Sequence, residues 1–173
     1  MGAMNSKLTF AFTILLAVTL FAGCGEGKDP YEIFGNSQAI PTIALPMDVS
    51  NVGGAAISPA KDRLDITVAG TTATVPLVSP VNGIVTAIDG VGPYTLTIFH
   101  NSRFSIQIGN LGTLPGVRVG DAVIEGQILA AVYTISPLIY FSVFQNGAAV
   151  CPLVAFNATA RDRIRAFTPV PCP

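Results

Sequence analysis

The sequence predicts an all-β fold, an antiparallel sandwich or barrel, that ends in one short helix. Between residues 64 and 144 the chain is a series of short segments rich in Val, Ile, Thr and aromatic residues. Most of these segments are bounded by Gly, Pro, Asn or Asp, and several boundaries are dipeptides that favour tight hairpins, such as Asn82-Gly83 and Asn146-Gly147. Short strands joined by hairpin turns are typical of antiparallel sheets.

Seven segments are expected to be strands. In residues 94–100 threonines alternate with Leu and Ile, which is the pattern of a strand with one buried face. The helix is expected over residues 158–167, where the charged residues are grouped away from Ile164 and Phe167 and a proline follows. The expected strands cover residues 64–70, 72–78, 83–89, 94–100, 103–109, 122–132 and 139–144.

The N-terminus has the pattern of a bacterial export signal. Lys7 is the only charged residue before an apolar run over residues 8–22, which is shorter than the ~20 residues that span a bilayer as a helix. The sequence LFAGC at residues 20–24 resembles a lipobox, at which the cysteine is lipidated and becomes the new N-terminus. We therefore expect a signal peptide over residues 1–23 and a lipid on Cys24.

A polar tether over residues 24–40 and one domain over residues 41–173 are expected to follow the signal. The alternatives are an ordinary secretory signal with an incidental cysteine, or an uncleaved anchor. Cys24 is followed by Gly25 rather than Asp, which, by resemblance to lipoproteins of bacteria with two membranes, favours the periplasmic face of the outer membrane in such a host. The expected localisation is the cell envelope, with the membrane as a partner through the lipid.

Charge and cysteine content narrow the function further. From Cys24 onward there are 8 basic and 10 acidic residues without a basic patch, which excludes nucleic acid as a partner. Cys151 and Cys172 remain as an even pair in an oxidising compartment, and we expect them to form a disulfide that closes a loop of ~20 residues.

Four segments in order resemble the LytM-type (M23) zinc peptidases, which cut peptide cross-links in peptidoglycan. The resemblance runs from about residue 61 to residue 156 and implies the β fold of that family. The matching segments are PVNGIV at residues 80–85, TIFHN at residues 97–101, VRVGDAVIEGQIL at residues 117–129, and YFSV at residues 140–143.

The resemblance fails at the catalytic positions. Asp65 occupies the position of a zinc-binding Asp, but Lys61 occupies that of the first zinc-binding His, Asn110 that of a catalytic His, and residues 138–140 (LIY) that of an H-x-H. The whole chain has one histidine, His100, whereas catalytic zinc needs about three protein ligands. We therefore expect no catalytic residue, no metal, no cofactor and no enzyme activity, and we interpret His100 as a structural or surface residue.

The resemblance also implies a function, because degenerate LytM domains bind the cell wall or activate cell-wall amidases. The expected partner is therefore peptidoglycan or an amidase, held in a groove lined by Lys61, Asp65, Asn110 and Tyr140. Three alternatives stay open: a structural or assembly lipoprotein that acts through protein contacts, a periplasmic adaptor, and an M23 metallopeptidase by descent. A fourth reading, acid–base catalysis by Asp62 and Asp65, is weaker because carboxylates three residues apart are ordinary at a solvated strand edge.

Overall fold

The computed structural model describes residues 39–135 and 138–168, and the elements within them are mostly strands. The strands are β1 (Val52–Ile57), β2 (Leu64–Val68), β3 (Thr74–Val78), β4 (Gly83–Asp89), β5 (Tyr94–Asn101), β6 (Phe104–Leu111), β7 (Ala122–Val123), β8 (Ile128–Tyr133), β9 (Leu138–Gln145) and β10 (Ala148–Val150). The helical elements are the 3-10 helices η2 (Val49–Asn51) and η3 (Pro152–Val154) and the α-helix α2 (Ala158–Arg165).

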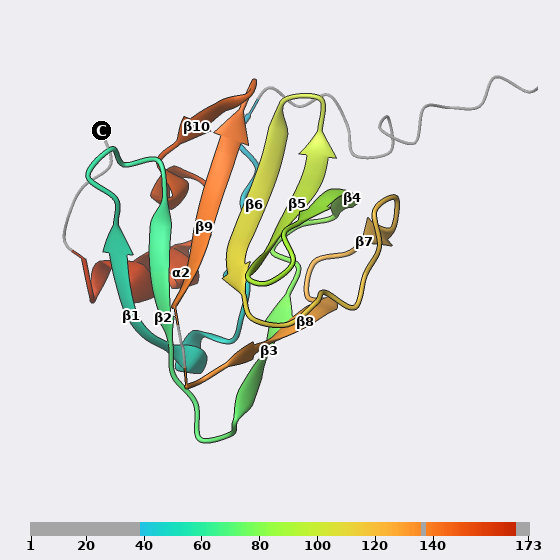
Figure 1. Ribbon diagram of the computed structural model, residues 1–173. Helices are drawn as coiled ribbons and strands as arrows, with labels where there is room; N and C mark the ends of the chain where they lie inside the picture. Colours follow the sequence, from blue (N-terminus) through green and yellow to red (C-terminus); the bar gives the residue numbers. More distant parts are fainter. Residues whose placement is uncertain (1–38, 136–137, 169–173) are drawn as a thin grey trace, which may run out of the picture. The chain divides into compact units, whose positions relative to one another are not determined.

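Eight strands form one antiparallel sheet in the order β1-β2-β9-β6-β5-β4-β7, with β10 also paired to β9 (Figure 1). The other two strands, β3 and β8, form a separate antiparallel ribbon below it in the same view. Strands β9 and β6 lie at the centre of the main sheet, so that residues distant in the sequence become neighbours there. This arrangement confirms the predicted all-β antiparallel class with a short helix near its end.

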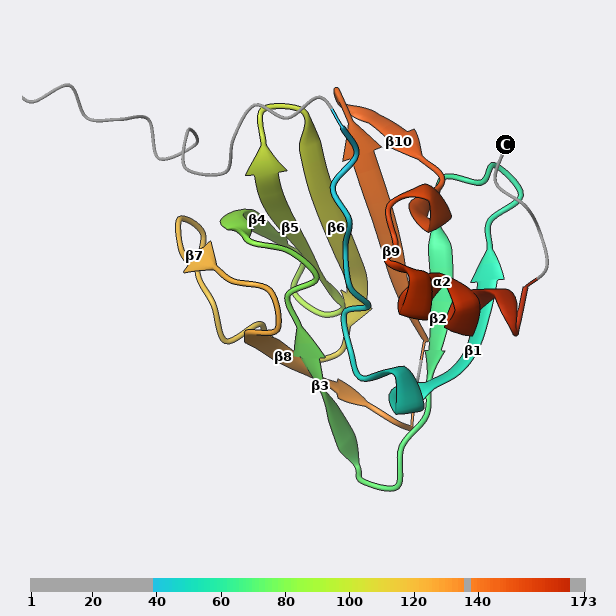
Figure 2. The ribbon, with the colours of Figure 1, turned by 180° about the vertical axis from the view of Figure 1, so that it is seen from behind.

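The core lies on one face of the main sheet. Figure 2 shows that α2 and the segment leading into η2 cross this face. Phe141 of β9 stacks on Phe156, with ring centroids 5.3 Å apart, and Ile43 forms a parallel bridge with Phe156. Within the described residues, the buried cluster runs from Ile43 to Ile164.

The predicted elements agree with the structure, with three differences. The expected strand over residues 122–132 is divided into β7 and β8 by a turn, and α2 ends at Arg165 rather than at residue 167. Strands β1 and β10 were not predicted, because both are dominated by Gly and Ala, which favour no strand by themselves. Among the described residues there is no helix long and apolar enough to cross a membrane.

Candidate functional site

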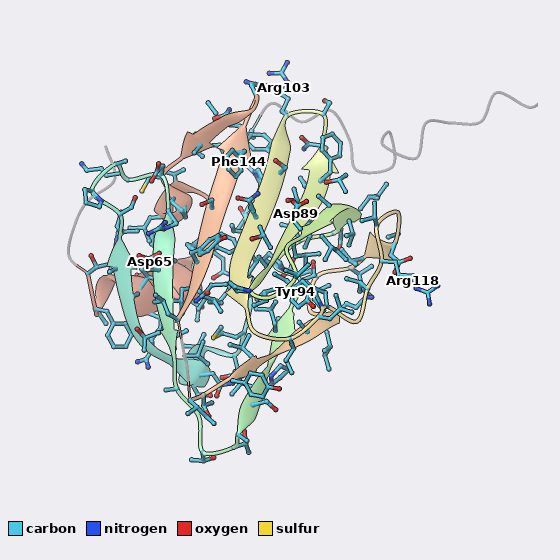
Figure 3. All side chains as sticks on the ribbon, in the orientation of Figure 1. Asp65, Asp89, Tyr94, Arg103, Arg118 and Phe144 are labelled. Atoms are coloured by element: carbon cyan, nitrogen blue, oxygen red, sulfur yellow. The ribbon has the colours of Figure 1, made fainter. Side chains whose placement is uncertain are left out.

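The strand register brings Asp65 and Tyr140 together on the open face of the sheet. Asp65 of β2 is paired with Tyr140 of β9, and Tyr140 is paired in turn with Gly109 of β6. Figure 3 marks Asp65 on β2 and, across the sheet, Tyr94 at the start of β5. Two of the four predicted groove residues are thus direct neighbours in one row across three strands.

The Tyr140 ring lies flat over Gly109. A Cβ atom built on Gly109 would be 2.0 Å from Cζ of the tyrosine, so only glycine leaves room for this ring. The Tyr140 hydroxyl is 2.9 Å from Oγ1 of Thr95 on β5 and shares a hydrogen bond with it. The ring therefore bridges from β9 over β6 to β5, and its hydroxyl has a partner within the domain.

Arg63 completes this row, and sequence reasoning did not identify it. Its Nε donates to Oδ1 of Asp65 at 2.8 Å and its Nη2 donates to Oδ2 at 3.2 Å, which is a bidentate pair. Its Cζ is also 5.6 Å from the centroid of the Tyr140 ring. The hydrogen bond to Asp65 raises the pKa of the Arg63 guanidinium, with the charge of Asp65 as the second cause. A permanent cation thus lies against the carboxylate of Asp65.

The spacing of Arg63 and Asp65 could have revealed this contact. Side chains two residues apart in an extended segment point to the same face, so a basic residue at position 63 faces the same side as Asp65. The pair is partly open to solvent, with the Arg63 side chain 47% exposed and that of Asp65 25% exposed. It is therefore accessible to a ligand on the open face.

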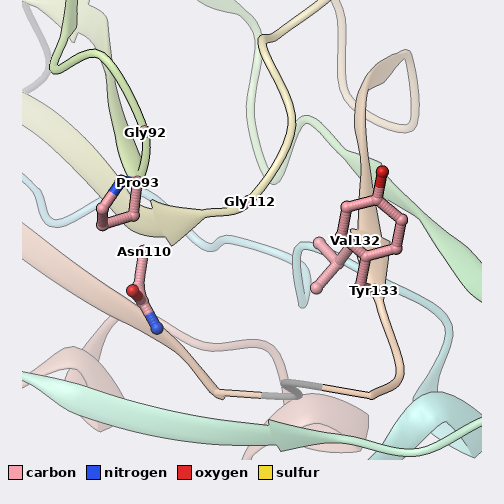
Figure 4. A pocket seen from close by; sticks show the side chains of 6 residues that line it. All are labelled: Gly92, Pro93, Asn110, Gly112, Val132 and Tyr133. Carbon is pink, nitrogen blue, oxygen red and sulfur yellow. The ribbon is translucent and has the colours of Figure 1, made fainter.

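Asn110 lies at the end of β6 in a left-handed backbone conformation, with φ of 62°. Asn tolerates this backbone region better than most residues. Its side-chain Nδ2 donates to the carbonyl oxygen of Leu138 on the neighbouring strand β9. Asn110 also lines a pocket of about 250 Å³ between the β4–β5 hairpin and β8. In Figure 4, Pro93 and Asn110 form one wall of this pocket and Tyr133 forms the other.

Lys61 lies in the turn between β1 and β2, with φ of 60°. Between described residues, no hydrogen bond or ion pair connects its side chain with Asp65, Asn110 or Tyr140. Asp62 in the same turn accepts a hydrogen bond from the Ser58 hydroxyl at 2.6 Å, whereas Asp65 is paired with Arg63. The structure therefore makes Asp65 and Tyr140 neighbours, and it gives Asp62 and Asp65 separate partners.

The remaining predicted residues lie elsewhere or outside the described ranges. His100 is on β5, as expected, with Nδ1 2.7 Å from the carbonyl oxygen of Asn82. In residues 39–135 and 138–168 no group of three or more His, Cys, Asp or Glu side chains could hold a metal ion. Cys24 and Cys172 lie outside the described residues, so the lipid and the disulfide stay predictions; Cys151 is half-buried directly before η3.

Beyond this row, the open face continues as a polar band. Gln107 of β6 is paired with Ser142 of β9 and with Thr97 of β5. Their side chains alternate with buried Ile106 and Ile108, as the sequence predicted for a sheet with one open face. Ser142 itself is buried, so Gln107 and Thr97 are the two of these polar side chains that are partly exposed beside the Tyr140 ring.

Solved structures with the same fold include peptidases of the M23 family. A putative M23 peptidase from Pseudomonas aeruginosa matches with a TM-score of 0.54 and 22% identity, covering 90% of this chain and 66% of that one. Csd3 from Helicobacter pylori matches with a TM-score of 0.54 and 16% identity over 68% of this chain, which spans only 35% of Csd3. The SpoIIQ–SpoIIIAH pore-forming complex contains a chain that matches with a TM-score of 0.55 and 15% identity, covering 69% and 93%.

No protein-family model and no curated protein matches the sequence. At identities of 15–22% the structural matches establish the fold and leave the activity open. The antiparallel sheet and the short helix nevertheless agree with the fold that the motifs predicted. The described domain has the M23 peptidase fold, also called the LytM fold.

Proposed function

We propose that this chain is a lipid-anchored envelope protein whose LytM-like domain binds peptidoglycan, alone or together with a cell-wall hydrolase, without cleaving it. The observation that carries the proposal is the position of the Arg63 guanidinium. It donates two hydrogen bonds to the Asp65 carboxylate, and its Cζ lies 5.6 Å from the centroid of the Tyr140 ring. By resemblance, Asp65 and Tyr140 lie at positions that hold zinc in active M23 peptidases.

Arg63 supports a non-catalytic role on electrostatic grounds. A metal ion at Asp65 would have to displace a cation that already makes two charge-assisted hydrogen bonds to the carboxylate. The neighbouring Tyr140 hydroxyl is engaged with Thr95, and a neutral phenol is a poor zinc ligand compared with imidazole. The row thus has one carboxylate, Asp65, paired with the positive guanidinium of Arg63, where a hydrolase of this fold needs an open metal site.

The same row offers groups that suit a glycan–peptide strand. The exposed side of a Tyr ring provides a flat surface for a sugar face or an alkyl group, while hydroxyl and amide side chains provide hydrogen bonds. Arg63 retains N–H groups beyond the two that bond Asp65, since a guanidinium has five. The pocket beside Asn110 extends this surface toward Tyr133.

The test is co-sedimentation of residues 28–173 with purified peptidoglycan sacculi. Saturable binding is expected, and Tyr140→Ala and Asn110→Ala are expected to weaken it several-fold. Glu125→Ala is the matched control, because Glu125 is exposed on the β7–β8 turn, away from the row. Absence of binding by the folded wild-type domain would refute the proposal, and stoichiometric zinc in the purified protein would refute its non-catalytic part.

A second candidate function, assembly through protein contacts, rests on a different surface. Leu114 and Ile128 are each 65% exposed and, with Pro76, line a shallow groove of about 520 Å³ over the β3–β8 ribbon. Exposed aliphatic side chains gathered in one groove are typical of protein contact sites. If Leu114→Asp abolishes function in cells while sacculus binding persists, this second function is favoured over the first.

A further inference from the structure

The outer edge of β1 has neither charge nor proline over residues 54–57, and a β-bulge between Val52 and Gly54 interrupts the strand only before that stretch. Strand edges expose unpaired backbone groups, and proteins normally shorten, cover, charge or interrupt them with proline. Strands β7 and β10 are two and three residues long, and β3 has Pro76 at its centre. The outer edge of β8 is covered by Gly116, whose N–H donates to the carbonyl of Leu129, and by Thr113, which donates to that of Ala131.

The register shows which backbone groups of β1 face outward. Ser58 N–H donates to the carbonyl of Arg63 and closes the hairpin, so the next bonded pair with β2 is Ala56 with Asp65. The N–H and C=O groups of Ala55 and Ile57 must then point away from β2. The Val52 carbonyl also points outward, where it receives Nη2 of Arg163, because the β-bulge between Val52 and Gly54 shifts the alternation by one residue.

No described residue bonds to the outward groups of Ala55 and Ile57. The strand reads VGGAAI, without charge and without proline, and its exposed residues are Gly53 and Ala56. Small uncharged residues allow another strand to approach closely. The edge is therefore open to another strand over residues 54–57, beyond the bulge.

We propose that β1 pairs antiparallel with β1 of a second copy of this chain, forming a dimer with one continuous sheet. Ala55 of each copy then faces Ile57 of the other, and their outward groups form four backbone hydrogen bonds around a twofold axis at Ala56. Because β1 has no charge, self-pairing brings no like charges face to face.

Charge at the two ends of the strand favours a second copy as the occupant. In this register the β1–β2 turn of one copy lies beside η2 of the other, which places Lys61 opposite Asn51 and three residues along the chain from the exposed Asp48. Asp62 of the same turn and Asp48 each accept a hydrogen bond from a nearby serine hydroxyl, that of Ser58 and that of Ser50. A single strand pair is a small interface, so the dimer is weak in free solution and is promoted when copies are tethered at one membrane.

The first test is sedimentation velocity of residues 28–173 over a concentration series. Dimerisation with a Kd of about 100 µM or tighter is expected. Ala55→Pro removes an outward N–H without touching the ladder to β2, and it is expected to weaken the dimer about tenfold or more. Ala55→Ser keeps the N–H and is the matched control, expected to dimerise like the wild type.

A second variant decides the question if Ala55→Pro fails to fold. Ala56→Cys places two cysteines opposite each other at a non-hydrogen-bonded pair, where Cβ atoms are ~4.5–5.5 Å apart and oxidation can link them. Thr67→Cys on β2, one strand in from the edge, is the control and should remain unlinked. A monomeric wild type, a dimer that resists Ala55→Pro, or cross-linking of Thr67→Cys but not of Ala56→Cys would each overturn the proposal.

Discussion

The ring of Tyr140 lies so close over Gly109 that a methyl group there would be 2.0 Å from Cζ. The atoms in the way are the far end of a side chain and not backbone, so Gly109→Ala is expected to turn the ring aside and leave the sheet intact. The ring then loses its hydrogen bond to Thr95, which costs about 1 kcal/mol of unfolding free energy. Chemical denaturation gives this loss, and the ring NMR shifts of Tyr140 report the displacement.

Thr95→Val is the matched control for Gly109→Ala, because it removes the same hydrogen bond without entering the space of the ring. It should cost a similar free energy while the Tyr140 ring shifts change little. If Gly109→Ala lowered the unfolding free energy by several kcal/mol more than Thr95→Val does, the Tyr140 ring would be unable to turn aside and the prediction would be wrong.

The Arg63–Asp65 pair is expected to orient the side chains of the candidate site while contributing little to the unfolding free energy. Because both side chains are partly exposed, breaking the pair with Arg63→Ala should cost only ~0.2–1 kcal/mol of unfolding free energy. Arg63→Lys keeps the charge but cannot bond both carboxylate oxygens with the same planar geometry, so it should restore less than half of the coupling. A double-mutant cycle with Asp65→Asn measures the coupling energy; a value above about 2 kcal/mol would contradict this expectation.

The sequence predicted the strands of this domain well because their side chains alternate. Burial alternates over residues 95–99 of β5 and over residues 104–108 of β6, and both strands begin at or within one residue of the predicted position. Strand β1 escaped prediction because Gly53, Gly54, Ala55 and Ala56 have no side-chain pattern to read. Its place in the sheet depends on the pairing with β2, which is tertiary information.

The candidate site was predictable only in part, for a related reason. Motif resemblance placed Asp65 and Tyr140 at corresponding family positions, and the register between β2 and β9 makes them neighbours. The partners of those side chains are not encoded in any motif. Arg63 reaches Asp65 because it directly precedes β2 and its side chain lies on the same face of the chain as that of Asp65. Thr95 reaches Tyr140 only because Gly109 leaves space for the tyrosine ring between them.

Acid should weaken the start of β1 through Asp48. Asp48 accepts hydrogen bonds from the hydroxyl and the N–H of Ser50, and these two bonds, the hydroxyl first, lower the pKa of its carboxyl. Since the folded pKa lies below the unfolded one, the stabilisation is present above the unfolded pKa and is lost as pH falls through the folded pKa, below about pH 4.

Ser50→Ala is therefore expected to raise the pKa of Asp48 toward its ordinary value. An NMR titration of the carboxyl carbon measures this pKa directly. Ser58→Ala, which removes a comparable hydroxyl–carboxylate bond at Asp62, should leave Asp48 unchanged. An Asp48 pKa that did not rise in Ser50→Ala would show that these hydrogen bonds are not its cause.

The lipid anchor predicted on Cys24 has a simple biochemical consequence. The full-length chain expressed in a bacterial host should partition with membranes and carry the mass of a lipid on a new N-terminal cysteine, whereas Cys24→Ser should lack that mass. Membrane fractionation and intact-mass measurement check both points. Phe21→Leu, which brings the segment nearer to a typical lipobox, is the control and should be lipidated at least as well as the wild type. A wild type that lacks lipid mass would refute the anchor.

The disulfide predicted between Cys151 and Cys172 should fasten the end of the chain to the start of η3. In the chain-entropy model a closed loop of ~20 residues contributes roughly 3 kcal/mol, so Cys151→Ser should lower the unfolding free energy by about that amount. Thiol titration of residues 28–173 in denaturant should find no free thiol before reduction and two afterwards. Cys172→Ser should match Cys151→Ser, and the double variant should be no less stable than either, because one bond is lost in all three. Additive losses would mean that the two cysteines act independently, and free thiols in the oxidised protein would refute the bond outright.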